Sequence, residues 1–146
     1  MPLEEEISDA IAFHYRLKDD LRTALATGRS HHTVAGLCRD DRCRLGQWLH
    51  GLDESIKVTP RWQCVRGLHA DFHREAAAVL EAALGGGGTT SRRISAYSSS
   101  YTGIARRFEN ELRSWKREAA NQLAVTRVRS SLPTEAPTEL SASVVG

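Results

Sequence analysis

Three long segments of this 146-residue chain carry apolar residues at every third or fourth position, the spacing of one face of an α-helix. The first covers residues 3–27 and the second residues 59–84. The third opens near Ser91, reaches at least Asn121 and has the longest stripe: Ile94, Tyr97, Tyr101, Ile104, Phe108, Leu112, Trp115 and Ala119. No segment alternates apolar and polar residues as a half-buried strand does. The pattern therefore predicts an all-α fold.

Helix start and stop residues stand at the ends of these segments. Gly28 follows the first segment and is a suitable C-cap. Thr59 and Pro60 open the second, as an N-cap residue followed by proline at the first helical position. The run Gly85–Gly88 ends that helix. These signals fix where the long helices begin and end.

A short helix is expected between the first two long ones. Residues 29–42 lose the periodicity and read as a connecting segment with room for one helical turn. The stretch CRLGQWL, from Cys43 to Leu49, reads as a brief helix closed by Gly51. We therefore predict an antiparallel four-helix bundle of three long helices and one short helix that carries the cysteine motif.

The composition divides the chain into two parts. Residues 1–125 are expected to form the bundle, because 40% hydrophobic residues suffice for one core at this length. Residues 126–146 end in SLPTEAPTELSASVVG, which is rich in proline, serine and threonine and has no period. This part is expected to be a disordered tail.

Charge and motif content argue against several classes of function. The net charge is only +2, and the basic pair Arg106 and Arg107 is interleaved with Glu109 and Glu111, which indicates a solvated helix face and no nucleic-acid partner. The acidic start MPLEEEISDA is unlike a secretory signal, and no apolar stretch approaches a membrane span, so we expect a cytoplasmic protein without membrane contact. No nucleophile and base pair, P-loop or dinucleotide fingerprint occurs. An enzyme with a small-molecule substrate is therefore not expected.

Two histidines on the second long segment are spaced to share one ion. In GLHADFHRE, His69 and His73 stand at i and i+4, so both rings project from one helix face. Taken alone, such a pair is more often a pair of surface histidines, and HADFH is not the HExxH motif of zinc proteases.

A third histidine and a cysteine complete a possible ligand set. His14 lies on the apolar stripe of the first segment, where an imidazole without a partner is costly, although a lone histidine there is more often a satisfied core residue. With Cys43 the set becomes three imidazoles and one thiolate from three different helices. Zinc accepts this mixture in tetrahedral geometry.

The ordered set of motifs resembles the bacterial chemoreceptor zinc-binding (CZB) domain family. The family pattern is a histidine in the first helix, C-x-[LF]-G-x-W-[LIY], and H-x-x-[FL]-H. It is matched here by His14, by CRLGQWLHG from Cys43 to Gly51, and by HADFH. The resemblance covers roughly residues 5–120 and implies that His14, Cys43, His69 and His73 bind Zn²⁺ in a four-helix bundle, commonly a homodimer. Many members carry tryptophan where this chain has Leu17, which affects packing but not the ligands.

The resemblance also implies a sensory role. Members are thought to sense hypochlorous acid or zinc availability through the zinc-bound cysteine, here Cys43, and to regulate chemoreceptors or diguanylate cyclases. This chain has neither the methyl-accepting coiled coil nor a GGDEF-like motif, so we expect a stand-alone member that signals in trans. Two alternatives remain: a constitutive bundle in which zinc is only a structural staple, and a di-iron bundle, which Glu75 and Glu81 do not build.

The other cysteines and histidines are expected to lie outside the metal site. Cys64 falls on an apolar face as a small hydrophobe, and Cys38 is in the irregular segment, where it is a hypothetical resolving thiol for an oxidised Cys43. The remaining histidines, His31, His32 and His50, are expected to be exposed. The adjacent pair His31 and His32 offers weak secondary metal binding.

Overall fold

The computed structural model describes residues 2–85 and 90–131, and within these ranges the chain is helical with connecting loops and has no strand. This confirms the all-α prediction. Three helices are long: α1 (Leu3–Thr27), α5 (Pro60–Leu84) and α6 (Thr90–Ser131). The predicted short helix is α3, and two further short helices flank it: α2 (Val34–Leu37), α3 (Arg44–His50) and α4 (Glu54–Lys57).

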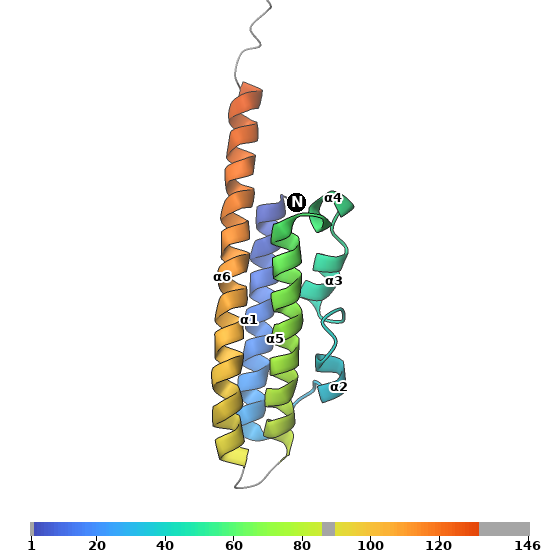
Figure 1. Ribbon diagram of the computed structural model, residues 1–146, viewed down its shortest axis with the longest axis vertical. Coiled ribbons are helices and arrows are strands. Elements are labelled where there is room, and N and C mark those ends of the chain that lie inside the picture. The colour runs from blue at the N-terminus through green and yellow to red at the C-terminus, as the bar shows by residue number, and fades with distance from the viewer. Residues whose placement is uncertain (1, 86–89, 132–146) are drawn as a thin grey trace, which may run out of the picture.

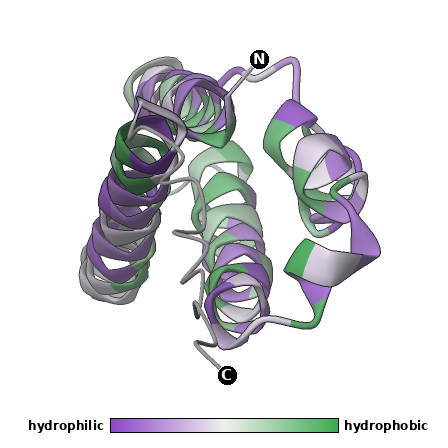
Figure 2. Ribbon diagram, turned by 90° about the horizontal axis from the view of Figure 1, so that it is seen from above, coloured by the Kyte–Doolittle hydropathy of each residue, from purple (hydrophilic) through white to green (hydrophobic). Residues whose placement is uncertain are grey.

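The long helices lie side by side, and α6 runs in the opposite direction to α1 and α5 (Figure 1). Between α1 and α5, the chain climbs back through α2, α3 and α4, which lie on one side of the three long helices (Figure 2). Contacts join α2 and α4 to α5, and α3 to α1. The Cys43 motif is thereby carried on an interrupted, ascending segment that lies beside α5.

The predicted helix ends are confirmed at α1 and α5. Gly28 adopts the left-handed conformation (φ 69°), and its N–H donates to the Ala24 carbonyl. At the start of α5, the Thr59 hydroxyl accepts a hydrogen bond from the Trp62 N–H, and Pro60 occupies the first turn. Both ends satisfy backbone groups that a helix terminus otherwise leaves unpaired.

The core consists of two clusters of buried apolar residues, stacked along the bundle. The first cluster joins α1, α3, α5 and α6 through Ile7, Ala10, Leu45, Leu49, Trp62, Val65, Phe108, Leu112 and Trp115. The second joins α1, α2, α5 and α6 through Leu21, Ala24, Leu37, Phe72, Ala76, Ala77, Leu80 and Ala105. Since α3 packs into the first cluster and α2 into the second, the loop between them crosses the junction of the clusters.

The structure extends the sequence analysis at three points. It adds α4, whose N-cap Asp53 accepts a hydrogen bond from the Ser55 N–H. It carries α6 on to Ser131, past the boundary predicted at residue 125. Trp115 is buried against Trp48 in the first cluster, so this part of the aromatic stripe is core.

Some predictions fall on parts of the chain that the structure does not describe. Residues 86–88 of the glycine run, the side chains of Ile94 and Tyr97, and the tail from residue 132 onward lie outside the described residues. Among the described helices, none combines the length and apolar character needed to cross a membrane.

Candidate metal centre

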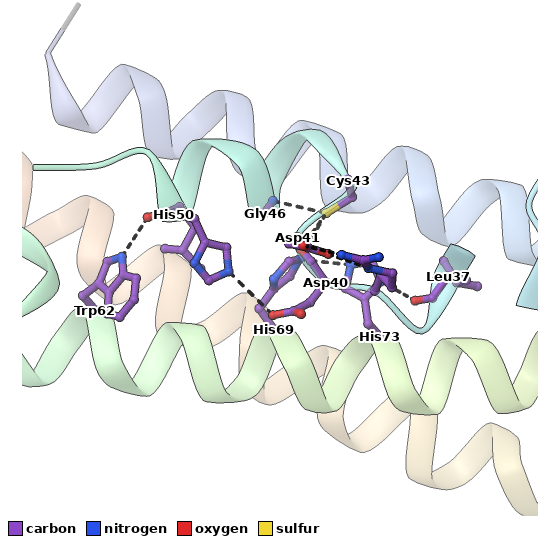
Figure 3. A network of polar contacts seen from close by, with 11 residues as sticks. Leu37, Asp40, Asp41, Cys43, Gly46, His50, Trp62, His69 and His73 are labelled. Atoms are coloured by element: carbon purple, nitrogen blue, oxygen red, sulfur yellow. Dashed lines mark hydrogen bonds and ion pairs between the residues drawn. The ribbon is translucent and has the colours of Figure 1, made fainter. Parts of the chain in front are cut away.

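Cys43, His69 and His73 bring three potential ligand atoms together at the junction of the two clusters. Cys43 Sγ lies 3.3 Å from His69 Nε2, and the two Nε2 atoms of His69 and His73 are 3.1 Å apart. All three atoms lie within 4.8 Å of one another. Figure 3 shows the cysteine reaching toward α5 from the start of α3, opposite the two histidines.

The two histidines are held with one nitrogen each toward this point. Both side chains are buried on α5, one turn apart. His73 Nδ1–H donates to the Leu37 carbonyl at 2.8 Å, which leaves Nε2 as the nitrogen with a free lone pair. His69 Nδ1 has no hydrogen-bond partner among the described residues, so Nε2 is its nitrogen that faces polar groups. Each ring thus presents Nε2 to the cysteine sulfur or to its neighbour.

Burial keeps the imidazoles uncharged. The apolar surroundings, together with the neighbouring His73, lower the pKa of His69 to about 2. Burial also lowers the pKa of His73, against the opposing effect of its bond to Leu37. Neutral imidazoles have a lone pair at physiological pH, which metal ligation requires.

Cys43 is the N-cap of α3, one residue before the helix itself begins at Arg44. Its Sγ accepts a hydrogen bond from the Gly46 N–H at 3.2 Å. Burial nevertheless raises the pKa of the Cys43 thiol, and the backbone N–H groups offset this only in part. The effect of burial therefore outweighs the stabilisation that a helix N-terminus offers to a thiolate, and the group is a thiol at neutral pH unless a cation lies beside it.

Gly46 permits the close contact that brings Cys43 to α5. A Cβ at this position would lie 1.8 Å from the Asp40 carbonyl oxygen and 3.2 Å from His69 Cε1. The α2–α3 loop therefore crosses directly over the backbone of α3, and only glycine leaves room for it. The glycine of the CRLGQWL motif is explained by this crossing.

His14, the fourth predicted ligand, lies beside this group but does not join it. It lines the same cavity, of about 240 Å³, as Cys43, His69 and His73. Its ring packs on Phe72 and Phe108, with centroids 4.6 and 5.0 Å away. Its Nε2 lies 3.0 Å from Glu109 Oε1, and burial lowers the pKa of His14 to about 4 despite this bond.

Glu109 is a polar partner that the sequence analysis placed wrongly. It was assigned to a solvated helix face, whereas its side chain is buried, accepting from Lys18 Nζ at 2.6 Å and from His14. Burial acts to raise the pKa of Glu109, but the hydrogen bonds from Lys18 and His14 together have the larger effect, so the pKa is lowered. The signal was present in the spacing: Glu109 stands four residues after Ala105 and three before Leu112, on the apolar stripe of α6.

The other two cysteines lie apart from the site. Cys38 is exposed at the end of α2. Cys64 is also exposed, so its assignment to an apolar face is wrong; the buried face of α5 passes through its neighbour Val65 instead. Cys43, which is half-buried, is the cysteine closest to the histidines of α5.

The donor set fits a tetrahedral zinc ion. Nitrogen and sulfur ligands at zinc distances stand about 3.3–3.6 Å from each other, close to the separations of the three grouped atoms. Imidazole and thiolate are ligands that zinc favours. These three residues could therefore hold a metal ion, with His14 next to them in the cavity.

Comparison with known proteins gives one finding. The family model of the chemoreceptor zinc-binding domain matches residues 14–80, a range that begins at His14 and contains Cys43, His69 and His73. No curated protein and no solved structure shows a significant match to the chain.

Acidification should destabilise the metal-free chain between pH 6.5 and about 4. In this window the unfolded chain binds a proton at His14 that the folded chain does not, so the free energy of unfolding falls as pH falls. His69 acts in the same direction, and its contribution extends to lower pH. Urea unfolding at a series of pH values, with a chelator present, measures the slope. The His69→Gln variant should show a shallower slope, and equal slopes would contradict the assignment.

Replacing Gly46 with alanine should distort the crossing of loop and helix. We expect a loss of about 1–3 kcal/mol in the free energy of unfolding, the usual cost of forcing an extra methyl into a packed site. Gly67→Ala is the matched control, because a Cβ there meets nothing within 4 Å in the middle of α5. Urea denaturation should find that variant as stable as the parent or up to about 1 kcal/mol more stable. A Gly46→Ala protein of parental stability would refute the close approach.

Proposed function

We propose that the chain is a zinc-binding signalling module whose zinc-bound Cys43 senses oxidant or zinc availability, and the match of residues 14–80 to the chemoreceptor zinc-binding domain model supports this proposal. One observation carries this proposal: Cys43 Sγ and the Nε2 atoms of His69 and His73 converge within 4.8 Å of one another. A single sulfur among nitrogen ligands makes that sulfur the oxidisable atom of the site.

We propose His14 as the fourth ligand. Its place in the cavity wall beside the other three supports this assignment, as does its position at the start of the matched family range. Its nitrogens stand outside the group of three, and its Nε2 is engaged by Glu109, so ligation requires a movement of the His14 side chain. Glu109 and Lys18 then act as the partners that hold His14 when it does not bind metal.

The residues explain why oxidation would be selective for one cysteine. Bound zinc would supply the positive charge that keeps Cys43 deprotonated against the effect of burial. Cys43 is half-buried and lines the cavity, so a small neutral oxidant such as hypochlorous acid can reach it. The thiolate attacks chlorine and releases hydroxide, and water then displaces chloride and a proton to give the sulfenic acid. Sulfur loses two electrons, and chlorine gains them as chloride.

Three contacts would transmit this change to the short helices. Cys43 Sγ is bonded to the Gly46 N–H of α3, and the Asp40 carbonyl of the preceding loop lies against the same glycine. On the other side, His73 holds the Leu37 carbonyl of α2. A sulfur that loses its negative charge and gains an oxygen atom alters the first contact, so the loop and the start of α3 are the elements expected to shift.

The second candidate is a constitutive zinc staple. One observation favours it: the grouped side chains lie at the junction of the two apolar clusters and tie α2, α3 and α5 together. Zinc at that point would stabilise the fold whether or not it is sensed. The two candidates differ in whether oxidant releases the metal.

We propose that the output passes in trans, through a homodimer or through a chemoreceptor or diguanylate cyclase partner in the cytoplasm. The family match supports a role in chemoreceptor signalling. Helix α6 projects past α1 and α5, and Val125 and Val128 are exposed on that projection, which offers apolar surface to a partner (Figure 1). With four protein ligands, the centre has no open position for a substrate, so we propose no catalytic role.

Cys43→Ser should lower zinc affinity and abolish the response to hypochlorous acid. Elemental analysis before and after stoichiometric oxidant should find about one tightly bound zinc per parent chain, lost on oxidation. Cys38→Ser and Cys64→Ser are the matched controls, because both cysteines are exposed and lie outside the site; they should release zinc like the parent. Zinc that stays bound in the oxidised parent would favour the staple.

His14→Gln tests the fourth ligand. Changes to residues that merely support a metal ligand cost roughly 10–100-fold in affinity, so loss of a direct ligand should weaken zinc binding at least about tenfold. Competition with a chromophoric chelator measures this. Glu109→Gln, which keeps the size of the side chain, should instead leave zinc affinity equal or tighter, because it weakens the hold on His14. Unchanged affinity in His14→Gln would reduce the site to three protein ligands.

A further inference from the structure

A second group of potential metal ligands lies at the C-terminal end of α1. Asp20 Oδ2 lies 2.9 Å from His32 Nε2 and 3.6 Å from His31 Nε2. The two imidazole rings lie against each other, with centroids 4.1 Å apart. All three ligand atoms fall within 4.8 Å of one another, as do those of Cys43, His69 and His73.

Local hydrogen bonds hold this group in place. The left-handed turn at Gly28 reverses the chain after α1 and returns it toward Asp20. The Thr27 hydroxyl accepts from the Arg29 N–H at 3.2 Å, and the Ser30 hydroxyl accepts from the His32 N–H at 3.0 Å. The adjacent histidines are therefore presented to the carboxylate by a defined turn.

The donor chemistry suits a divalent ion that exchanges with solvent. Two imidazoles and one carboxylate are zinc ligands, and their separations of 2.9 and 3.6 Å bracket those of a tetrahedral site. Three protein ligands leave a fourth position for water. The His31 side chain is 74% exposed, so water competes for the ion, and we expect weaker binding than at the buried group.

The location connects this group to the central site. The cavity of about 240 Å³ that holds Cys43, His69 and His73 is also lined by Asp20 and His32. Because His31 and Asp20 are open to solvent while His69 and His73 are buried, the second group stands at the mouth of that cavity. An ion bound to the second group therefore lies beside the cavity through which a metal ion would reach Cys43, His69 and His73.

We propose that Asp20, His31 and His32 form a second, exchangeable zinc site. Zinc ions would pass through it when they enter or leave the central site of Cys43, His69 and His73. Binding at this second site is independent of the central one. The transfer role rests on the proposed function, since it requires a zinc-binding centre at Cys43, His69 and His73.

Zinc titration of the full, metal-stripped chain tests the site itself. We expect two zinc ions per parent chain, one tight and one weaker, and loss of the weaker one in the double variant His31→Ala/His32→Ala and in Asp20→Asn. Asp19→Asn is the matched control, because Asp19 is the exposed neighbour of Asp20 and pairs with Arg22 instead. Cys43→Ser should retain the weaker ion. A weaker ion that survives in the double variant, or a single zinc per parent chain that the double variant retains, would overturn the site.

The rate at which a metal ion loads into the metal-stripped chain, measured by stopped flow, tests the transfer role. Cobalt(II) takes the place of zinc in this experiment, because its thiolate charge-transfer absorption reports arrival at a cysteine, and Cys43 is the cysteine that lies beside His69 and His73. Loading should be several-fold slower in His31→Ala/His32→Ala than in the parent or Asp19→Asn, with unchanged final absorbance. Equal rates would overturn the transfer role, whereas absence of the thiolate band in every protein would count against the proposed central site and not against the second one.

Discussion

The structure depends on one costly arrangement: imidazole and thiol groups buried between two apolar clusters. Polar groups in such a place are unfavourable unless they find partners. His73 has the Leu37 carbonyl and His14 has Glu109. Within residues 2–85 and 90–131, His69 Nε2 has only Cys43 and His73 as polar partners. Burial lowers the pKa of both histidines of the group and raises that of the thiol, so all three are neutral without a metal. A cation shared by these three side chains would supply the missing partner.

The interrupted segment α2–α4 follows from the same requirement. A continuous helix beside α5 could not place both a backbone carbonyl on His73 and a sulfur on His69. The loop between α2 and α3 does so, with Cys43 as an N-cap and Gly46 leaving room for Asp40. Helices α2 and α3 are anchored separately, α2 through Leu37 in the second cluster and α3 through Leu45 and Leu49 in the first. The candidate metal centre therefore lies where the two clusters of the core meet, so a change in one of its contacts can affect both clusters.

Local signals made much of this predictable. Periodicity and capping residues predicted the ends of α1 and α5 correctly. The i, i+4 spacing of His69 and His73 predicted that both rings project from one face of α5. The Cys43 motif gave the start of α3. What the sequence could not reveal were pairings between distant helices: the spacing of Glu109 places it on the apolar stripe of α6, but not beside His14, which lies 95 positions earlier in the chain. Whether burial or the helix terminus controls the Cys43 thiol is likewise a balance of surroundings that spacing does not encode.

A sensor must release zinc when its sulfur is oxidised, whereas a structural zinc site must keep the ion. The Cys43 sulfur is half-buried while His69 and His73 are buried, so it is the ligand on which this difference depends. Zinc X-ray absorption on the chain loaded with one equivalent shows whether this sulfur binds zinc together with the histidines. If Cys43 and the three histidines are the ligands, the spectrum should show one sulfur at about 2.3 Å and three nitrogens at about 2.0–2.1 Å. A first shell of nitrogen and oxygen alone would contradict this ligand set.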